Sequence, residues 1–215
     1  RVGQRRGVPI REAFNQKTQE GAMHPRIMAT REDFERIAEQ SKSDSYLNSL
    51  KESLLLQADK IINEPVLEYQ FMDSMRLWRV AYNFTSRMER LGFAYQMTGD
   101  SKYVGRAWKE MQSICSFPDF NVNHVIDSGL FCTGMGIGYD WMYHGFTEEQ
   151  RQLISDTAMR LGLGVLDKAF YGRLPSAGSG GKTGGTVNCT GIFPKWKSNY
   201  NTYVNGGLVV CALAM

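Results

Sequence analysis

The sequence predicts an all-α protein made of successive antiparallel helical hairpins. Apolar residues recur at spacings of three and four along most of the chain, which is typical of amphipathic helices. Short turns separate these stretches, and the alternating apolar pattern of strands is nearly absent. The pattern leaves open whether the hairpins form a bundle, a solenoid or a closed α/α toroid, although no fixed-period repeat favours a simple solenoid.

Residues 1–29 are predicted to form an extended N-terminal arm that lies on a helical domain of residues 30–215. The arm contains glycine and proline and shows no sustained periodicity. Thr30 and Asp33 resemble an N-terminal capping box, which predicts the first helix. A second amphipathic helix follows and ends before Pro65.

A helical hairpin is predicted next. Its first helix runs from about Ser74 to Met97, where apolar residues alternate at spacings of four and three. Gly99 and Asp100 then form the turn into a second amphipathic helix, so the two helices should pack antiparallel.

Glycine marks the helix that we expect between His124 and Tyr143. Four of its positions lack a side chain and therefore allow neighbouring backbones to approach closely. These positions are Gly129, Gly134, Gly136 and Gly138. Thr147 to Gln150 form a second capping box, which predicts a continuous helix through Ala169.

Gly172 to Gly191 form a glycine-rich segment without a core pattern, which predicts a surface loop. Gly181-Lys182-Thr183 matches the end of a phosphate-binding loop, but Gly184-Gly185 stand where the helix of such a loop should begin. The final helix is predicted to begin near Asn199. Because its apolar residues have no later helix to pack against, we expect the chain to continue beyond Met215.

Composition argues against two classes of partner. The chain carries 25 basic and 22 acidic residues, a net charge of +3, and no basic stripe of the kind that nucleic acid requires. No apolar run reaches the roughly 20 residues that a membrane span needs. Residues 1–20 lack the apolar centre of a signal peptide, although a cleaved signal could have preceded Arg1. We therefore expect no nucleic-acid partner and no membrane insertion.

The four cysteines show no spacing typical of metal binding. Cys115, Cys132, Cys189 and Cys211 lie mostly in apolar surroundings, where a free thiol behaves as a small hydrophobic group. We therefore expect neither a metal site nor a disulfide framework, and no residue pattern implies a cofactor.

A cluster of rings and amides around the start of the final helix is the main candidate site. It comprises Trp196, Asn199, Tyr200, Asn201 and Asn205. One asparagine could cap the helix, but buried amides this dense usually have a hydrogen-bonding role. The positive end of the helix dipole would also favour a carboxylate. Local capping together with a turn is the alternative explanation.

Further polar residues could line a cleft. His124 and Asp127 are three residues apart and share a helical face, so they could form an orienting pair or simply a hydrogen-bonded helix start. Asp140 could be a catalytic carboxylate or could anchor a turn. Arg76 and Arg79 are candidate contacts for an anionic ligand.

Several short motifs are specific when their order and spacing are taken together. They are His24-Pro25-Arg26-Ile27, the turn Tyr95 to Asp100 with Tyr103, Phe117 to Asn121 ahead of His124 and Asp127, Gly138 to Tyr143, and Asn199-Tyr200-Asn201 with Asn205-Gly206-Gly207. Over roughly Met23 to Met215 the chain resembles the N-terminal helical domain of the heparinase II/III family of polysaccharide lyases and its alginate lyase relatives.

This resemblance implies a partial α/α toroid, followed in the full-length protein by a β-sandwich domain, in a periplasmic or secreted bacterial enzyme. Such lyases cleave the bond to O4 of a uronic acid by β-elimination. The enzyme must neutralise the carboxylate, remove the C5 proton and protonate the leaving oxygen. The implied partner is an acidic polysaccharide, with heparin or heparan sulfate slightly ahead of alginate.

The resemblance also implies roles for residues. Asn199 matches the residue that neutralises the carboxylate, and Tyr200 could stack on sugar or share in proton transfer. The expected lining of the cleft is Asn201, Trp196, His124 and Asn205, with Arg76 or Arg79 as anion contacts. The family usually has asparagine where Ser198 stands and tryptophan where Tyr200 stands. Two alternatives are an α/α toroid hydrolase, which needs two opposed carboxylates, and a non-catalytic glycan-binding module.

Overall fold

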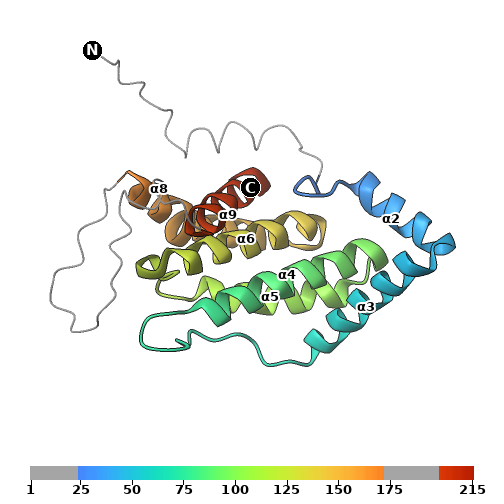
Figure 1. Ribbon diagram of the computed structural model, residues 1–215, viewed down its shortest axis with the longest axis horizontal. Coiled ribbons are helices and arrows are strands. Elements are labelled where there is room, and N and C mark those ends of the chain that lie inside the picture. The colour runs from blue at the N-terminus through green and yellow to red at the C-terminus, as the bar shows by residue number, and fades with distance from the viewer. Residues whose placement is uncertain (1–23, 172–198) are drawn as a thin grey trace, which may run out of the picture.

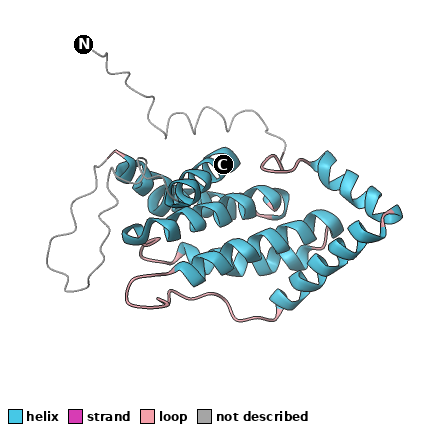
Figure 2. Cartoon of the chain, in the orientation of Figure 1, coloured by secondary structure: helices cyan, strands magenta, loops and turns pink. Residues whose placement is uncertain are grey.

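The computed structural model describes residues 24–171 and 199–215, which form helices joined by loops (Figures 1 and 2). These residues contain no strand, which confirms the predicted all-α class. The long helices are α2 (Arg31–Ser43), α3 (Ser45–Ile62), α4 (Trp78–Thr98), α5 (Ser101–Cys115), α6 (Val125–Trp141), α7 (Glu148–Thr157) and α9 (Asn199–Ala214), and α8 (Gly164–Phe170) is shorter. Single turns are η1 (Val122–His124) and η2 (Tyr143–Gly145), and η3 (Ala158–Leu163) is π-helical. The predicted glycine-rich loop and most of the predicted arm lie outside the described residues.

Helices α4 and α6 run side by side in the same direction. The backbone N–H of Leu77, just before α4, donates to the Asp127 carboxylate in the first turn of α6 at 2.7 Å. At the opposite ends of the two helices, the Gln96 side chain donates to the carbonyl of Trp141. The contacts therefore keep the same order along both helices, as parallel packing requires. Helix α6 is slightly shorter than the predicted helix, because turns of 3₁₀ helix stand at both of its ends.

Glycine allows α9 to pack closely against α6; the sequence predicts close backbone packing at these glycines but not which helix supplies the contact. A Cβ atom on Gly129 would stand 2.7 Å from the carbonyl oxygen of Tyr203, and one on Gly136 would stand 2.9 Å from the Cα of Cys211. Only a residue without a side chain fits at such separations. Because these contacts also keep their order along the two helices, α9 is parallel to α6, and the first turns of α4, α6 and α9 lie at one end of the molecule.

A second set of helices runs in the opposite direction. Arg87 of α4 donates to Glu64, just after the end of α3, at 2.6 Å, and Arg90 of α4 donates to Gln57 of α3 at 2.7 Å, so the residue order of α3 runs against that of α4. Gly99, with a φ angle of 69°, forms the predicted turn that reverses the chain from α4 into α5. Helices α3 and α5 therefore cover α4 in antiparallel orientation.

The helix predicted from Thr147 to Ala169 is interrupted by a π-helical stretch. The predicted capping box is present, since the Thr147 and Gln150 side chains each accept a hydrogen bond from the other's backbone N–H. Within η3, a Cβ atom on Gly162 would stand 2.6 Å from the Sγ atom of Cys132 in α6. The packing of η3 against α6 is thus a tertiary feature, which hydrophobic spacing does not predict.

Helix α4 begins at Trp78 rather than at the predicted Ser74. The Asp73 carboxylate accepts hydrogen bonds from the backbone N–H groups of Met75 and Arg76, at 2.9 and 2.8 Å, and this holds the segment in a turn. A side chain that bonds to nearby backbone in this way competes with helix formation. The apolar spacing continues through the turn and so conceals it.

The described residues before α2 lie on the helical domain, and Asp140 holds them there. His24 Nδ1 donates to Asp140 Oδ1 at 2.5 Å, and the N–H groups of Arg26 and Ile27 donate to Oδ2 at 2.9 and 2.8 Å. Asp140 has no exposed surface. Of the two alternatives for this residue, the anchoring role is confirmed, and a buried carboxylate with three donors has no access to a substrate.

The described cysteines are free and buried, as predicted. The thiols of Cys132 in α6 and Cys211 in α9 share a hydrogen bond, and this bond together with burial raises the pKa of Cys211 well above its usual value. Cys189 lies outside the described residues. Among the helices that are described, none combines the length and apolarity needed to cross a membrane.

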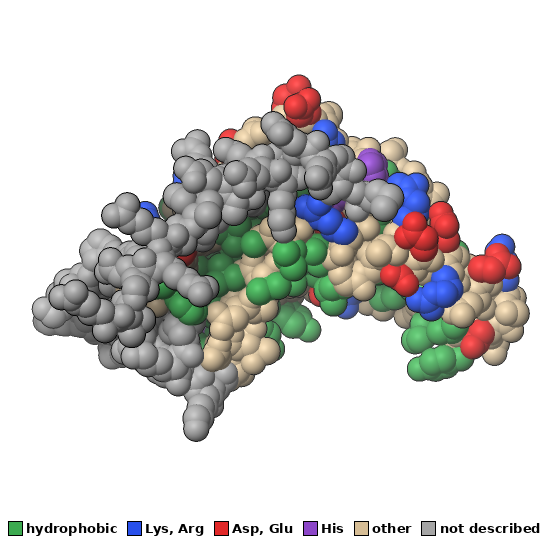
Figure 3. All heavy atoms as spheres, turned by 90° about the horizontal axis from the view of Figure 1, so that it is seen from above, with side chains coloured by type: hydrophobic (Ala, Val, Ile, Leu, Met, Phe, Trp, Pro, Cys, Tyr) green, Lys and Arg blue, Asp and Glu red, His purple; other side chains and the backbone are tan. Residues whose placement is uncertain are grey.

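Charged and apolar side chains are unevenly distributed on the face shown in Figure 3. Figure 3 shows acidic and basic side chains mixed at the end where α2 and α3 lie, and hydrophobic side chains over the middle, where α9 lies in Figure 1. The exposed large hydrophobic residues of α9 are Tyr203, Val209 and Leu213. On the face shown, the described residues therefore form no large patch of a single charge.

Candidate functional site

Five polar residues meet where α4, α6 and α9 begin, and we call them the His124 cluster. They are Arg76, Asn121, His124, Asp127 and Tyr200. Arg76 lies in the turn before α4, Asn121 precedes η1, Asp127 is in the first turn of α6, and Tyr200 is the second residue of α9. The parallel course of the three helices brings together residues that are more than a hundred positions apart in the chain.

Asp127 is the centre of this cluster. Its side chain has no exposed surface. Its carboxylate accepts hydrogen bonds from the Leu77 N–H at 2.7 Å, from Asn121 Nδ2 at 2.8 Å and from His124 Nδ1 at 2.7 Å. These donors satisfy the buried carboxylate and tie the start of α4 to the start of α6. Asp127 is therefore a positioning residue without access to a ligand.

The contact with Asp127 determines how the His124 ring is oriented. Because an ionised carboxylate can only accept hydrogen bonds, Nδ1 of His124 carries the proton and donates it to Asp127. In the neutral ring, Nε2 is then the proton acceptor. The His124 side chain is 11% exposed, and its ring meets the Tyr200 ring edge to face with 6.0 Å between centroids. The predicted orienting pair is thus present, with an acceptor nitrogen next to a phenol ring.

Arg76 supplies a positive charge to the cluster, but Asp73 already pairs with it. The Arg76 Nε atom donates to Asp73 Oδ2 at 2.6 Å, and Nη2 lies 2.5 Å from the same oxygen. The hydrogen bond and charge of Asp73 raise the pKa of Arg76, with smaller contributions from Asp127 and Tyr200. Arg76 therefore lies where the sequence predicts an anion contact, with part of its charge compensated. Arg79 is exposed one turn further on.

The predicted cluster of amides divides into two groups. Asn199 is the first residue of α9 and is exposed, next to Tyr200 at the end where the His124 cluster lies. Asn205 donates from Nδ2 to Oδ1 of Asn201 one helical turn away, so these two amides bond to each other along α9. Trp196 lies outside the described residues. Asn199 is therefore the predicted amide that has the most accessible position at the site.

Two exposed rings near the start of α4 were missed by the sequence analysis. Trp78 and Tyr82 are 39% and 52% exposed, and their rings stack with 5.3 Å between centroids and 20° between planes. They lie four residues apart on the solvent face of α4, and Trp78 directly follows Leu77, which bonds to Asp127. The signal in the sequence is this spacing of two large rings outside the apolar stripe. Flat exposed rings of this kind suit the faces of sugars.

Asn121 is a third residue that the sequence analysis missed as part of the site. Its φ angle of 54° lies in the left-handed region, which asparagine tolerates better than most residues. From this position its side chain donates to the carbonyl of Met75 and to Asp127, each at 2.8 Å. An asparagine just ahead of a helix suggests a turn, but its contact with the start of α4 depends on the tertiary fold.

The His124 cluster offers a proton acceptor, a phenol and a partly compensated cation, and the exposed Asn199 amide lies beside its phenol in the chain. Within residues 24–171 and 199–215, no group of three or more His, Cys, Asp or Glu side chains could hold a metal ion. A comparison with protein-family models finds no match for this chain, and no curated protein matches it either. The properties of the cluster suit a ligand that is both acidic and carbohydrate-like.

Proposed function

We propose that this chain is the helical part of a polysaccharide lyase that cleaves uronic-acid-containing glycans by β-elimination. The observation that carries the proposal is the His124 ring, held by buried Asp127 beside Tyr200 at the end of the molecule where α9 presents Asn199. From the family resemblance, we propose heparin or heparan sulfate ahead of alginate as the substrate, a periplasmic or secreted location, and no cofactor.

The architecture we propose is a partial α/α toroid. Helices α4, α6 and α9 are parallel, and α4 and α6 are each followed by helices that return in the opposite direction. Figure 1 shows α4, α6 and α9 as neighbours in this arrangement. An inner set of parallel helices with an outer set of antiparallel ones is the alternation expected of such a toroid, and the inner helices would then begin at the substrate cleft.

Each step of the elimination has a candidate group in the His124 cluster or next to one of its members in the chain. The Asn199 amide, at the positive end of the α9 dipole, hydrogen-bonds the uronate carboxylate as negative charge develops on it. His124 Nε2 accepts the C5 proton, and the C5–H electrons form the C4=C5 double bond while the C4–O4 bond breaks. The Tyr200 hydroxyl donates the proton that the leaving O4 requires. Trp78 and Tyr82 stack on neighbouring sugar rings.

Asp127 and Asp140, the two acidic residues that the sequence offers for a hydrolase, are occupied by hydrogen bonds within the fold. A glycoside hydrolase needs two carboxylates that face the scissile bond. Asp127 and Asp140 have no exposed surface and each accepts three hydrogen bonds. This disfavours the hydrolase alternative among the described residues and supports chemistry that depends on an amide, an imidazole and a phenol.

Replacing Asn199 with alanine is expected to abolish most lyase activity. The change removes one hydrogen-bond donor to the developing charge, and loss of such a donor typically lowers kcat by about 10²–10³-fold. Activity is measured as the ultraviolet absorbance of the conjugated C4=C5 product, with heparan sulfate and alginate as substrates. His124→Gln should lower kcat by about 10²-fold or more, because it removes the proton acceptor.

Asn48→Ala is the matched control for this experiment, because Asn48 is an exposed asparagine on α3, far along the chain from the cluster. It should leave the rate unchanged. Full activity of Asn199→Ala would refute the assigned role of the amide. An inactive wild-type chain that binds acidic oligosaccharides, and loses this binding on Trp78→Ala, would identify a glycan-binding module instead of a lyase.

A further inference from the structure

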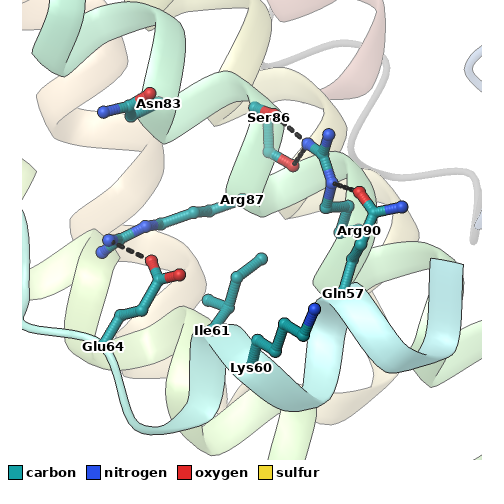
Figure 4. Close-up of a pocket in the computed structure, with 8 residues that line it drawn as sticks. All are labelled: Gln57, Lys60, Ile61, Glu64, Asn83, Ser86, Arg87 and Arg90. Carbon is teal, nitrogen blue, oxygen red and sulfur yellow. Dashed lines mark hydrogen bonds and ion pairs between the residues drawn. The ribbon is translucent and has the colours of Figure 1, made fainter. Parts of the chain in front are cut away.

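A pocket of about 370 Å³ lies between α3 and α4, apart from every residue that we assign to the lyase site. Its lining residues are Gln57, Lys60, Ile61, Glu64, Asn83, Ser86, Arg87 and Arg90. Figure 4 shows side chains from the two helices facing each other across the pocket, with polar ends around a single apolar residue, Ile61. The volume falls within the range of small-ligand sites.

The acidic residues around this pocket are already neutralised. Glu64 accepts from Arg87 Nη2 at 2.6 Å. Behind it, buried Glu110 accepts from Arg87 Nη1 and from Arg106 Nη2. These two arginines and two glutamates balance each other in charge. Whatever charge the pocket presents to a ligand therefore comes from its other ionisable residues.

Lys60 and Arg90 provide that charge, and both are positive. No carboxylate of the described residues forms an ion pair with either of them. Arg90 is held in place by neutral groups, since Nε donates to Gln57 Oε1 at 2.7 Å and Nη1 donates to the Ser86 carbonyl at 2.9 Å. Its second terminal nitrogen, Nη2, makes no hydrogen bond to another described residue. A guanidinium fixed in this way loses little conformational entropy when it binds.

We propose that this pocket binds a tetrahedral oxyanion, either a free sulfate or phosphate ion or a sulfate group carried on a glycan. Lys60 and Arg90, which both line the pocket, would donate charge-assisted hydrogen bonds to the anion from Nζ and from the guanidinium. The pocket lies on the face where α3 covers α4, whereas the His124 cluster lies at the helix starts. The oxyanion site is therefore independent of the proposed lyase chemistry.

Isothermal titration calorimetry of the 215-residue chain with sodium sulfate and sodium phosphate, at matched ionic strength, tests this site. We expect saturable binding that Lys60→Gln weakens about tenfold, because one charge-assisted hydrogen bond is lost. Lys60 is exposed and makes no contact that the fold requires, so the variant should keep its melting temperature. Lys109→Gln on α5 removes the same charge from an exposed residue outside the pocket and should leave the affinity unchanged.

Two further arms identify the source of the anion. Titration with a sulfated heparin-derived oligosaccharide and with its desulfated counterpart separates a glycan sulfate from a free ion. A preference for the sulfated oligosaccharide over inorganic sulfate supports a glycan subsite, and equal binding of the inorganic ions supports a free oxyanion. The absence of saturable binding, or equal weakening by Lys60→Gln and Lys109→Gln, would overturn the proposal. Asn199→Ala should leave this binding unchanged, even if the lyase proposal fails.

Discussion

Replacing Asp140 with alanine is expected to lower the free energy of unfolding by about 3–5 kcal/mol, because it removes one partner of a buried charged hydrogen-bond network. The carboxylate is fully buried and accepts hydrogen bonds from His24 Nδ1 and from the N–H groups of Arg26 and Ile27. Alanine would leave all three donors without a partner. The same change would weaken the attachment of residues 24–27 to α6, which would then depend on the hydrogen bond from Trp141 Nε1 to the Ile27 carbonyl.

Urea denaturation followed by circular dichroism measures this effect as a shift of the unfolding midpoint. Asp156→Ala is the matched control, since Asp156 is exposed on α7 and accepts a hydrogen bond only from Gln152 among the contacts described. It should change the free energy of unfolding by less than about 0.5 kcal/mol. If Asp140→Ala and Asp156→Ala shift the midpoint equally, Asp140 does not anchor the N-terminal segment.

Local sequence signals predicted most helix boundaries because the interactions that define them are local. The capping boxes at Thr30 and Thr147 join residues three positions apart, and both are present. Gly99 adopts the left-handed conformation expected of the turn between α4 and α5. The predicted start of α4 was wrong because the Asp73 side chain accepts hydrogen bonds from two backbone N–H groups and forms a turn. The apolar spacing continues through this turn, so it gives no sign that the helix begins later.

The candidate site was predicted only in part, because its central contacts join distant segments. Spacing along one helix predicted the pairing of His124 with Asp127. Nothing local could indicate that Leu77 and Asn121 donate to the same carboxylate, or that Tyr200 meets the His124 ring. These contacts depend on the parallel packing of α4, α6 and α9. Asn201 and Asn205 of α9 were both expected to line the cleft, and spacing alone did not predict that their side chains bond to each other.

Replacing Gly207 with alanine is expected to lower the free energy of unfolding by about 2–3 kcal/mol, the cost of overpacking a tight interior contact. A Cβ atom on Gly207 would stand 2.1 Å from the carbonyl oxygen of Gly129 and 2.8 Å from its carbonyl carbon. Both are backbone atoms, so no side chain can rotate to make room. Helices α6 and α9 would have to separate, and chemical denaturation of the variant would measure the loss.

The neighbouring Gly206 provides a matched control on the same helix. A Cβ atom there would meet nothing within 4 Å, and the residue is exposed. Gly206→Ala should therefore stabilise the protein by up to about 1 kcal/mol, because alanine is the better helix former. If Gly207→Ala lowers the free energy of unfolding while Gly206→Ala raises it, then the close contact between α6 and α9, and not helix propensity, is the reason that position 207 requires glycine. Because the same contact places Tyr200 beside His124, Gly207→Ala should also weaken the proposed activity. A Gly207→Ala protein that is as stable and as active as the wild type would contradict this packing.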